Sequence, residues 1–481
     1  MKTYDAVVVG SGPNGLAAAI TLARAGFSVK IFEKSSLAGG GMHSASLTLP
    51  GYIHDVCSAV HPLAVVSPFF KSLPLQKFGL RWIHSPLVLA HPLLEEEAIH
   101  LEVSPEDTAQ NLGEDAATYL RFVESMTKYS DEIFTEIFKP ALHWPRYPYL
   151  WARFGLSAML PAKTFARWKF RGPRARTLFA GLAAHVNAPL DGYGTAAVGL
   201  MLNMAAHLQG WPIPAGGSHE IARSMVAYFI SLGGEIELSK EIRSPGDLPK
   251  SRGVFLDMTP RQIVRFFGFD LSKENKKKLS DFSYGPGVFK TDWALSRPIP
   301  WKDTVCTQAA TVHIGGREED ILRSEEGPAR GEVKPRPFIL LSQPSLFDKS
   351  RAPEGKHVAW GYCHVPHGSE IDATTIIENQ IERFAPGFKN TILARSTLGP
   401  RELERMNPNL IGGDISGGNM TLKQLLFRPS LKLNPYKLSI PGYYICSSST
   451  PPGPGVHGMC GFNAAQSFIR EKSKSTVHDE F

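Results

Sequence analysis

The sequence predicts a two-domain α/β protein, in which a parallel sheet covered by helices is joined to an α+β domain with a mixed or antiparallel sheet. Three features lead to this prediction. Residues 1–41 read as a strand, a glycine turn, a helix and a second strand. Residues 74–209 carry apolar side chains mainly at helical spacing, and short apolar runs typical of strands return after residue 275.

The first segment contains the spacing of a dinucleotide-binding turn. A β-branched strand over residues 4–9 is followed directly by Gly10, Ser11, Gly12, Pro13, Asn14 and Gly15, and then by a helix. Gly10 permits a tight turn, Gly12 lets the backbone approach a pyrophosphate, and Gly15 allows the helix to pack closely on the strand. The helix N-terminus adds amide groups and partial positive charge. We therefore expect a Rossmann-type βαβ unit whose turn holds an adenine dinucleotide.

An acidic residue ends the second predicted strand. Glu33 lies about 20 residues after the glycine turn, as expected for a carboxylate that accepts the hydroxyl groups of an adenosine ribose. A carboxylate at this position disfavours NADP, because it repels the additional phosphate. Its neighbour Lys34 is a further candidate for binding the cofactor.

Composition and charge exclude several classes of protein. A net charge of +7 without a basic motif does not indicate nucleic-acid binding. The five cysteines form no Cys-x-x-Cys pair and no zinc spacing, so we expect no metal and a reducing, cytoplasmic environment. The longest apolar stretch, residues 194–206, is too short to span a bilayer. The sequence leaves the oligomeric state open.

Residues 53–62 carry two histidines where the chain leaves the first glycine-rich segment. The simpler interpretation is a structured loop in which polar side chains satisfy backbone groups. The alternative is that His61 or His54 transfers a proton in a reaction.

Residues 144–176 combine aromatic and basic side chains, and no acidic residue lies between Glu136 and Asp191. This mixture suits the surface of an anionic membrane, where aromatic rings lie at the level of the headgroups. The alternative is a solvated basic helix whose aromatic side chains pack inward. A peripheral membrane contact through this segment is thus a second expectation for the location of the protein.

The C-terminal segment contains a second glycine pattern, Gly453 to Gly458, after a predicted strand at residues 442–446. A second dinucleotide site would need a further strand and an acid about 20 residues later, and the chain has room only for one helix. This segment therefore completes the first cofactor site.

Taken together, these segments resemble the phytoene desaturase and amine oxidase superfamily of FAD-dependent oxidoreductases. The resemblance is closest to the branch of pyridine nucleotide-disulphide oxidoreductase domain-containing proteins. It spans the glycine turn, Glu33, the glycine cluster after it, residues 216–242, residues 407–418 and the C-terminal segment. It implies FAD rather than NAD, with additional cofactor contacts from Gly40, Gly41, Met42, Ile242, Ser449, Thr450, Gly458, Met459 and Asn463. Ser447 stands where the superfamily commonly has a glycine.

The resemblance also implies a cofactor domain assembled from separate segments. We expect residues 1–75, 213–275 and 431–481 to form the FAD-binding domain. Residues 76–212 are expected to form the helical part of the substrate domain, and residues 276–430 its sheet.

The chemistry implied is hydride transfer between flavin N5 and a carbon–carbon bond of a lipophilic, polyene or isoprenoid-like small molecule, as desaturation or saturation. The protein then mainly orients and shields the reactants. His457 is the most plausible acid or base, although a histidine bonded to the loop backbone is an equal alternative. Amine oxidation, a redox-neutral flavin-dependent isomerisation and a non-catalytic flavin-bound scaffold remain alternatives.

Overall fold

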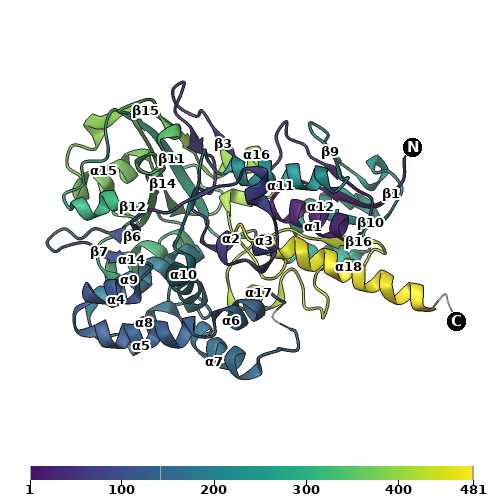
Figure 1. The fold of residues 1–481 in the computed structure, drawn as a ribbon, viewed down its shortest axis with the longest axis horizontal. Coiled ribbons are helices and arrows are strands. Elements are labelled where there is room, and N and C mark those ends of the chain that lie inside the picture. The colour runs from purple at the N-terminus through teal and green to yellow at the C-terminus, as the bar shows by residue number, and fades with distance from the viewer. Residues whose placement is uncertain (1, 141, 479–481) are drawn as a thin grey trace.

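The structure is a computed structural model that describes residues 2–140 and 142–478. Figure 1 shows two sheets toward opposite ends of the long axis, with helices between them and along one side. The predicted combination of a parallel sheet with a mixed sheet in a second domain is confirmed. Every helix in the described part of the chain is too short or too polar to cross a membrane.

The first sheet is parallel throughout and has the order β16-β10-β1-β2-β9. Its strands come from three distant parts of the chain: β1 (Tyr4–Val9), β2 (Val29–Phe32), β9 (Glu235–Glu237), β10 (Ser251–Leu256) and β16 (Tyr443–Ile445). β1 and the end of β10 are apolar because both faces of the sheet are covered there, whereas the edge strand β9 is Glu-Ile-Glu and half-buried. The helices of this domain are α1 (Pro13–Arg24), α11 (His219–Ser231), α12 (Pro260–Phe267), α13 (Lys273–Ser280) and α18 (Met459–His478).

The second sheet has the order β15-β11-β14-β13-β12-β6-β7 and is antiparallel except between β12 and β6. Its strands are β6 (Leu87–His91), β7 (Ile99–Leu101), β11 (Gly287–Leu295), β12 (Ala309–Ile314), β13 (Ile339–Ser342), β14 (His357–Val365) and β15 (Ile392–Leu398). The segment predicted to be helical therefore also contributes two strands, β6 and β7. The helices α14 (Glu318–Glu326), α15 (Thr374–Phe384) and α16 (Pro400–Met406) belong to the same part of the chain as the later strands.

A layer of helices from the middle of the chain covers one face of this second sheet. It consists of α4 (Pro105–Gln110), α5 (Ala116–Thr127), α6 (Ser130–Ile137), α7 (Pro148–Ala158), α8 (Ala162–Lys169), α9 (Pro173–Ala183) and α10 (Ala196–Gln209). Short elements connect the domains: α2 (Pro62–Val66), α3 (Pro68–Lys71), α17 (Leu422–Phe427) and two small ribbons that pair β3 (Ser44–Ala45) with β4 (His54–Asp55) and β5 (Trp82–Ile83) with β8 (Ile213–Pro214).

The last helix, α18, packs directly on α1. A Cβ atom at Gly461 would lie 1.8 Å from the backbone oxygen of Asn14, so the two helices approach through glycine. The C-terminal segment is thereby held beside the glycine turn at the other end of the sequence (Figure 1).

Candidate functional site

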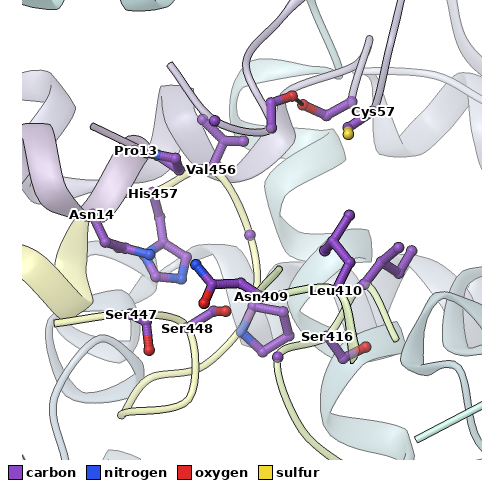
Figure 2. A pocket seen from close by; sticks show the side chains of 18 of the residues that line it. Pro13, Asn14, Cys57, Asn409, Leu410, Ser416, Ser447, Ser448, Val456 and His457 are labelled. Atoms are coloured by element: carbon purple, nitrogen blue, oxygen red, sulfur yellow. Dashed lines mark hydrogen bonds between the residues drawn. The ribbon is translucent and has the colours of Figure 1, made fainter. Parts of the chain in front are cut away.

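A cavity of about 1140 Å³ runs from the first turn of α1 to the second sheet. At one end it is lined by Gly10 to Asn14 and by the end of β2, and at the other by side chains of β11, β13 and β14. Figure 2 shows Pro13, Asn14 and His457 on one side of this pocket and Asn409 and Leu410 on another.

The structure brings most of the predicted site residues to this cavity. The residues that line it are Gly10, Gly12, Pro13, Asn14, Glu33, Lys34, Gly40, Gly41, His61, Ile242 and His457. The glycine cluster lies against the glycine turn, since a Cβ atom at Gly40 would be 3.0 Å from the Cα atom of Gly12. Two segments that are separate in the sequence therefore form one wall.

Other predicted residues lie behind the lining rather than in it. They are Gly15, Met42, Ser449, Thr450, Gly458, Met459 and Asn463. Met42 is fully buried, and the side chains of Ser449 and Thr450 donate hydrogen bonds to the backbone oxygens of Gly417 and Ser447. Asn463 donates to the backbone oxygen of Phe138. In this structure these residues support the C-terminal loop, and Val456 and His457 reach the cavity.

The glycine turn folds around a half-buried carboxyl group, Asp257, directly after β10. The amide of Gly15 donates to Asp257 Oδ2 at 3.1 Å. A Cβ atom at Gly12 would collide with Asp257 Oδ2 at 2.6 Å, and one at Gly10 would be in tight contact with Asp257 Cβ at 3.1 Å. Burial, together with the nearby Glu33, raises the pKa of Asp257 to about 7.

Replacing Asp257 with asparagine is expected to flatten the pH dependence of stability. The folded-state pKa is raised, so the stability contributed by the protonated carboxyl is lost as pH rises toward 7. Between pH 5 and pH 8 the free energy of unfolding of the wild-type protein should fall by about 3 kcal/mol relative to that of Asp257→Asn. The expected slope is about 1.4 kcal/mol for each pH unit below the folded pKa. Unfolding of the two unliganded proteins across this pH range measures the difference; parallel curves would contradict the prediction.

Glu33 holds the turn and also lines the cavity. Its carboxylate accepts hydrogen bonds from the amides of Ser11 and Ser35, each at 2.8 Å. The backbone of Lys240 donates to the backbone oxygen of Glu33 at 2.8 Å, which brings the nearby Ile242 to the same end of the cavity. The predicted ribose acceptor and the predicted adenine contact are thus neighbours.

The two candidate histidines, His457 and His61, differ in the hydrogen bonds that their rings make. Both ring nitrogens of His457 contact the backbone: Nδ1 accepts from the amide of Met459 at 3.0 Å, and Nε2 donates to the oxygen of Gly453 at 3.2 Å. His61 Nε2 lies 2.9 Å from Ser218 Oγ, and burial lowers the pKa of each histidine to about 4. The contacts of His457 favour the interpretation in which it organises the loop.

The loop of residues 407–418 connects the cofactor domain to the cavity. The side chain of Asn409 accepts from the amide of Thr259 and donates to the backbone oxygen of Asp257, both at 2.9 Å. The carboxylate of Asp414 accepts from the amides of Gly285, Ser416 and Gly418. Asp414, for which the sequence indicates no role, therefore fixes the shape of this loop.

A buried ion pair lies at the substrate end of the cavity. Lys290 of β11 pairs with Asp292, and its Nζ atom lies 5.2 Å from the centre of the Trp360 ring. His54 Nδ1 is 3.5 Å from the other oxygen of Asp292. Burial and the nearby Asp55 raise the pKa of Asp292 to about 6, although Lys290 acts in the opposite direction. Among the lining residues, Lys290 is the buried cation.

The sequence analysis assigned no function to Lys290 or Asp257. A signal for the first was present, because Lys290 and Asp292 are charged residues two positions apart in an otherwise apolar strand and so share one face. Asp257 follows directly on an apolar strand, which places it at the edge of the sheet where ligands of α/β proteins bind.

The sequence matches known proteins over its whole length. Residues 8–73 match the family model of the NAD(P)-binding Rossmann-like domain. The chain is 28% identical to pyridine nucleotide-disulfide oxidoreductase domain-containing protein 2 of Rattus norvegicus, over 97% of this chain and 94% of that protein. It is 24% identical to phytoene desaturase of Fusarium fujikuroi, over 94% of this chain and 86% of that protein.

The fold resembles that of putrescine oxidase in complex with putrescine. That structure has a TM-score of 0.62 and 15% identity, and the match covers 98% of this chain and 99% of the other. At this level of identity the likeness concerns the fold.

Proposed function

We propose that this chain is a flavin-dependent oxidoreductase of the phytoene desaturase-like and amine oxidase superfamily. Its cofactor is FAD. Its reaction is hydride transfer between FAD and a carbon–carbon bond of a lipophilic substrate, as desaturation or saturation.

The observation that carries this proposal is the continuity of the cavity. The first turn of α1 and Glu33 lie at one end, as a dinucleotide requires. The other end is walled by apolar side chains of α10, α17 and the second sheet: Val198, Met201, Leu202, Leu340, Leu422 and Leu425. One cavity can therefore hold an extended dinucleotide and present an apolar substrate to it.

FAD, when bound, would supply the hydride acceptor or donor at N5. The glycine turn and the amino end of α1 would hold its pyrophosphate, and Glu33 its ribose. Gly41 and Cys57 lie between that region and Lys290: a Cβ atom at Gly41 would be 3.8 Å from Cys57 Cβ, and the charge of Lys290 acts on the Cys57 thiol. Lys290 is thus placed to stabilise developing negative charge or to hold a proton near the reacting atoms.

Amine oxidation is the second candidate, suggested by the fold of putrescine oxidase. The lining of this cavity disfavours it. The rings of Trp360 and Tyr362 stack on each other at 5.7 Å and 13°, so they do not face each other across a gap in which an amine could bind.

Anaerobic titration of the purified, FAD-loaded protein tests the proposal. Bleaching of the flavin by a polyene, or reoxidation of the chemically reduced flavin by one, is the expected result. Bleaching by amines alone would favour the second candidate. A protein that retains no FAD after reconstitution would overturn the proposal, and a flavin that no candidate substrate reduces or reoxidises would favour the scaffold alternative.

We further propose that the substrate reaches the cavity from an anionic membrane surface through α7. This helix lines the cavity with Trp151 and Phe154, yet Leu156 on its outer face is 77% exposed. Its carboxyl end adjoins α17, because Met159 accepts a hydrogen bond from Gly194, beside which Leu425 lies. Exposed apolar and basic side chains also lie just before and on α7, at Trp144, Arg146, Tyr149 and Arg153, and at or just after the end of α8, at Trp168 and Arg171.

Binding to vesicles checks the membrane contact. We expect the protein to sediment with vesicles containing phosphatidylserine, less with phosphatidylcholine alone, and less as salt is added. The double variant Trp144→Ser/Leu156→Ser should lose most of this binding. The matched control is Leu393→Ser, because Leu393 is an exposed apolar residue of β15 outside this region. Equal sedimentation of both variants would contradict the assignment.

A further inference from the structure

Three polar side chains form a row across the second sheet at the substrate end of the cavity. Thr311 of β12 is paired in register with Ser342 of β13, and Ser342 is paired with Trp360 of β14. Because directly paired residues of neighbouring strands share one face of a sheet, the three side chains lie side by side. All three line the cavity.

Each of the three carries a buried polar atom without a partner in the described chain. Thr311, Ser342 and Trp360 are 5%, 2% and 7% exposed. Thr311 Oγ1, Ser342 Oγ and Trp360 Nε1 make no hydrogen bond to any described residue. Buried polar groups in folded proteins are nearly always satisfied, so an uncompensated row of three is unusual for a purely structural surface.

The chemistry of the row selects one kind of ligand. An indole Nε1 can only donate a hydrogen bond, whereas hydroxyl groups both donate and accept. Lys290, which lies over the Trp360 ring and is paired with Asp292, adds further N–H donors at the same end. The group that satisfies all of them is an oxygen with free lone pairs, such as a carbonyl or carboxylate oxygen. A hydrocarbon would leave the three atoms unpaired, and an ammonium group, which only donates, would leave Trp360 Nε1 without an acceptor.

We infer that Thr311, Ser342 and Trp360 form a head-group site that binds a carbonyl or carboxylate oxygen of the substrate. This inference rests on the proposed function, since it assigns the substrate of that same cavity. The substrate is then a lipophilic molecule with an oxygenated end. The row holds that end at the second sheet, and the apolar remainder lies along α10 and α17.

Calorimetric binding to the FAD-loaded chain tests the inference with three probes of equal chain length: decanoate, 2-decanone and decylammonium. Decanoate and 2-decanone are expected to bind at least about tenfold more tightly than decylammonium. The double variant Thr311→Val/Ser342→Ala should weaken both oxygenated probes about tenfold, a typical result of lost buried hydrogen bonds. It should leave decylammonium unchanged. Trp360→Phe keeps an aromatic ring and removes the Nε1 donor, and should weaken the same two probes.

Thr291→Val is the matched control. Thr291 also carries a buried Oγ1 with no partner among the described residues, but it lies between Lys290 and Asp292 on β11 and so faces the opposite side of the sheet. This variant should bind all probes as the wild type does. Equal affinity for the three probes, or an unchanged preference in the double variant with a native circular dichroism spectrum, would overturn the inference.

The two proposals can fail separately. If the protein retains FAD and a polyene reduces this FAD, but decanoate and 2-decanone bind no more tightly than decylammonium, only the head-group site is refuted. A preserved preference in a protein without redox turnover refutes only the proposed function.

Discussion

Replacing Gly461 with alanine is expected to destabilise the protein and release its cofactor. The new methyl group would lie 1.8 Å from the backbone oxygen of Asn14 and 2.9 Å from the amide of Ala18. Both neighbours are backbone atoms of α1, which cannot move aside without shifting the glycine turn. We expect a loss of about 3 kcal/mol, at the upper end of the range for overpacking. Flavin absorbance per protein after gel filtration, and the half-life at elevated temperature, measure the effect.

Gly155→Ala is the matched control for this variant. Gly155 also lies within a helix, α7, but a Cβ atom there would meet nothing within 4 Å. Alanine should therefore leave FAD content unchanged and stabilise the helix by about 0.5–1 kcal/mol. If Gly461→Ala behaved in the same way, α18 would not pack on α1 as the structure has it.

Replacing Lys290 with methionine is expected to slow reduction of the bound flavin by about 100-fold or more, with FAD content preserved. This is the lower end of the contribution of a positioned proton-transfer group. Stopped-flow measurement with the FAD-loaded protein and the polyene that reduces its flavin gives the rate constant. The variant also leaves Asp292 without its buried partner, which can destabilise the protein by about 3–5 kcal/mol.

The double variant Lys290→Met/Asp292→Asn separates the two effects. Removing both members of a buried ion pair is often close to neutral for stability, so the double variant should regain thermal stability. It should not regain flavin reduction if Lys290 acts on the reaction itself. If the flavin of the double variant is reduced at the wild-type rate, Lys290 serves only to neutralise the buried carboxylate of Asp292.

Much of the cofactor end could be predicted from local sequence. The glycine turn, the strand before it and Glu33 lie within one βαβ unit, so short-range spacing determines their geometry. Strands at residues 254–257 and 442–446 were also predicted, and the structure has them at Ser251–Leu256 and Tyr443–Ile445. That both belong to the domain of β1 follows from the resemblance and agrees with the sheet order, in which β16 pairs with β10 and β10 with β1.

The position of the C-terminal residues could not be predicted in this way. Ser449, Thr450 and Asn463 are predicted to contact the cofactor; in the structure their side chains donate to the backbone oxygens of Gly417, Ser447 and Phe138. Which face of a loop reaches a cavity depends on how that loop packs on distant segments, here α1 and the loop of residues 407–418. The sequence around these residues carries no periodicity from which this orientation follows.

By itself, the sequence determined that the chain contains a dinucleotide-binding βαβ unit and that a second, larger domain follows it, because both depend on local spacing and hydrophobic periodicity. Only the tertiary structure decided which distant residues lie beside that unit and at the far end of its cavity. Asp257 enters the glycine turn, and Lys290 joins Thr311, Ser342 and Trp360 at the far end of the cavity, through strand register and helix packing between residues far apart in the chain. Such long-range pairings leave no signal in a single sequence, and they determine which substrates the cavity can accept.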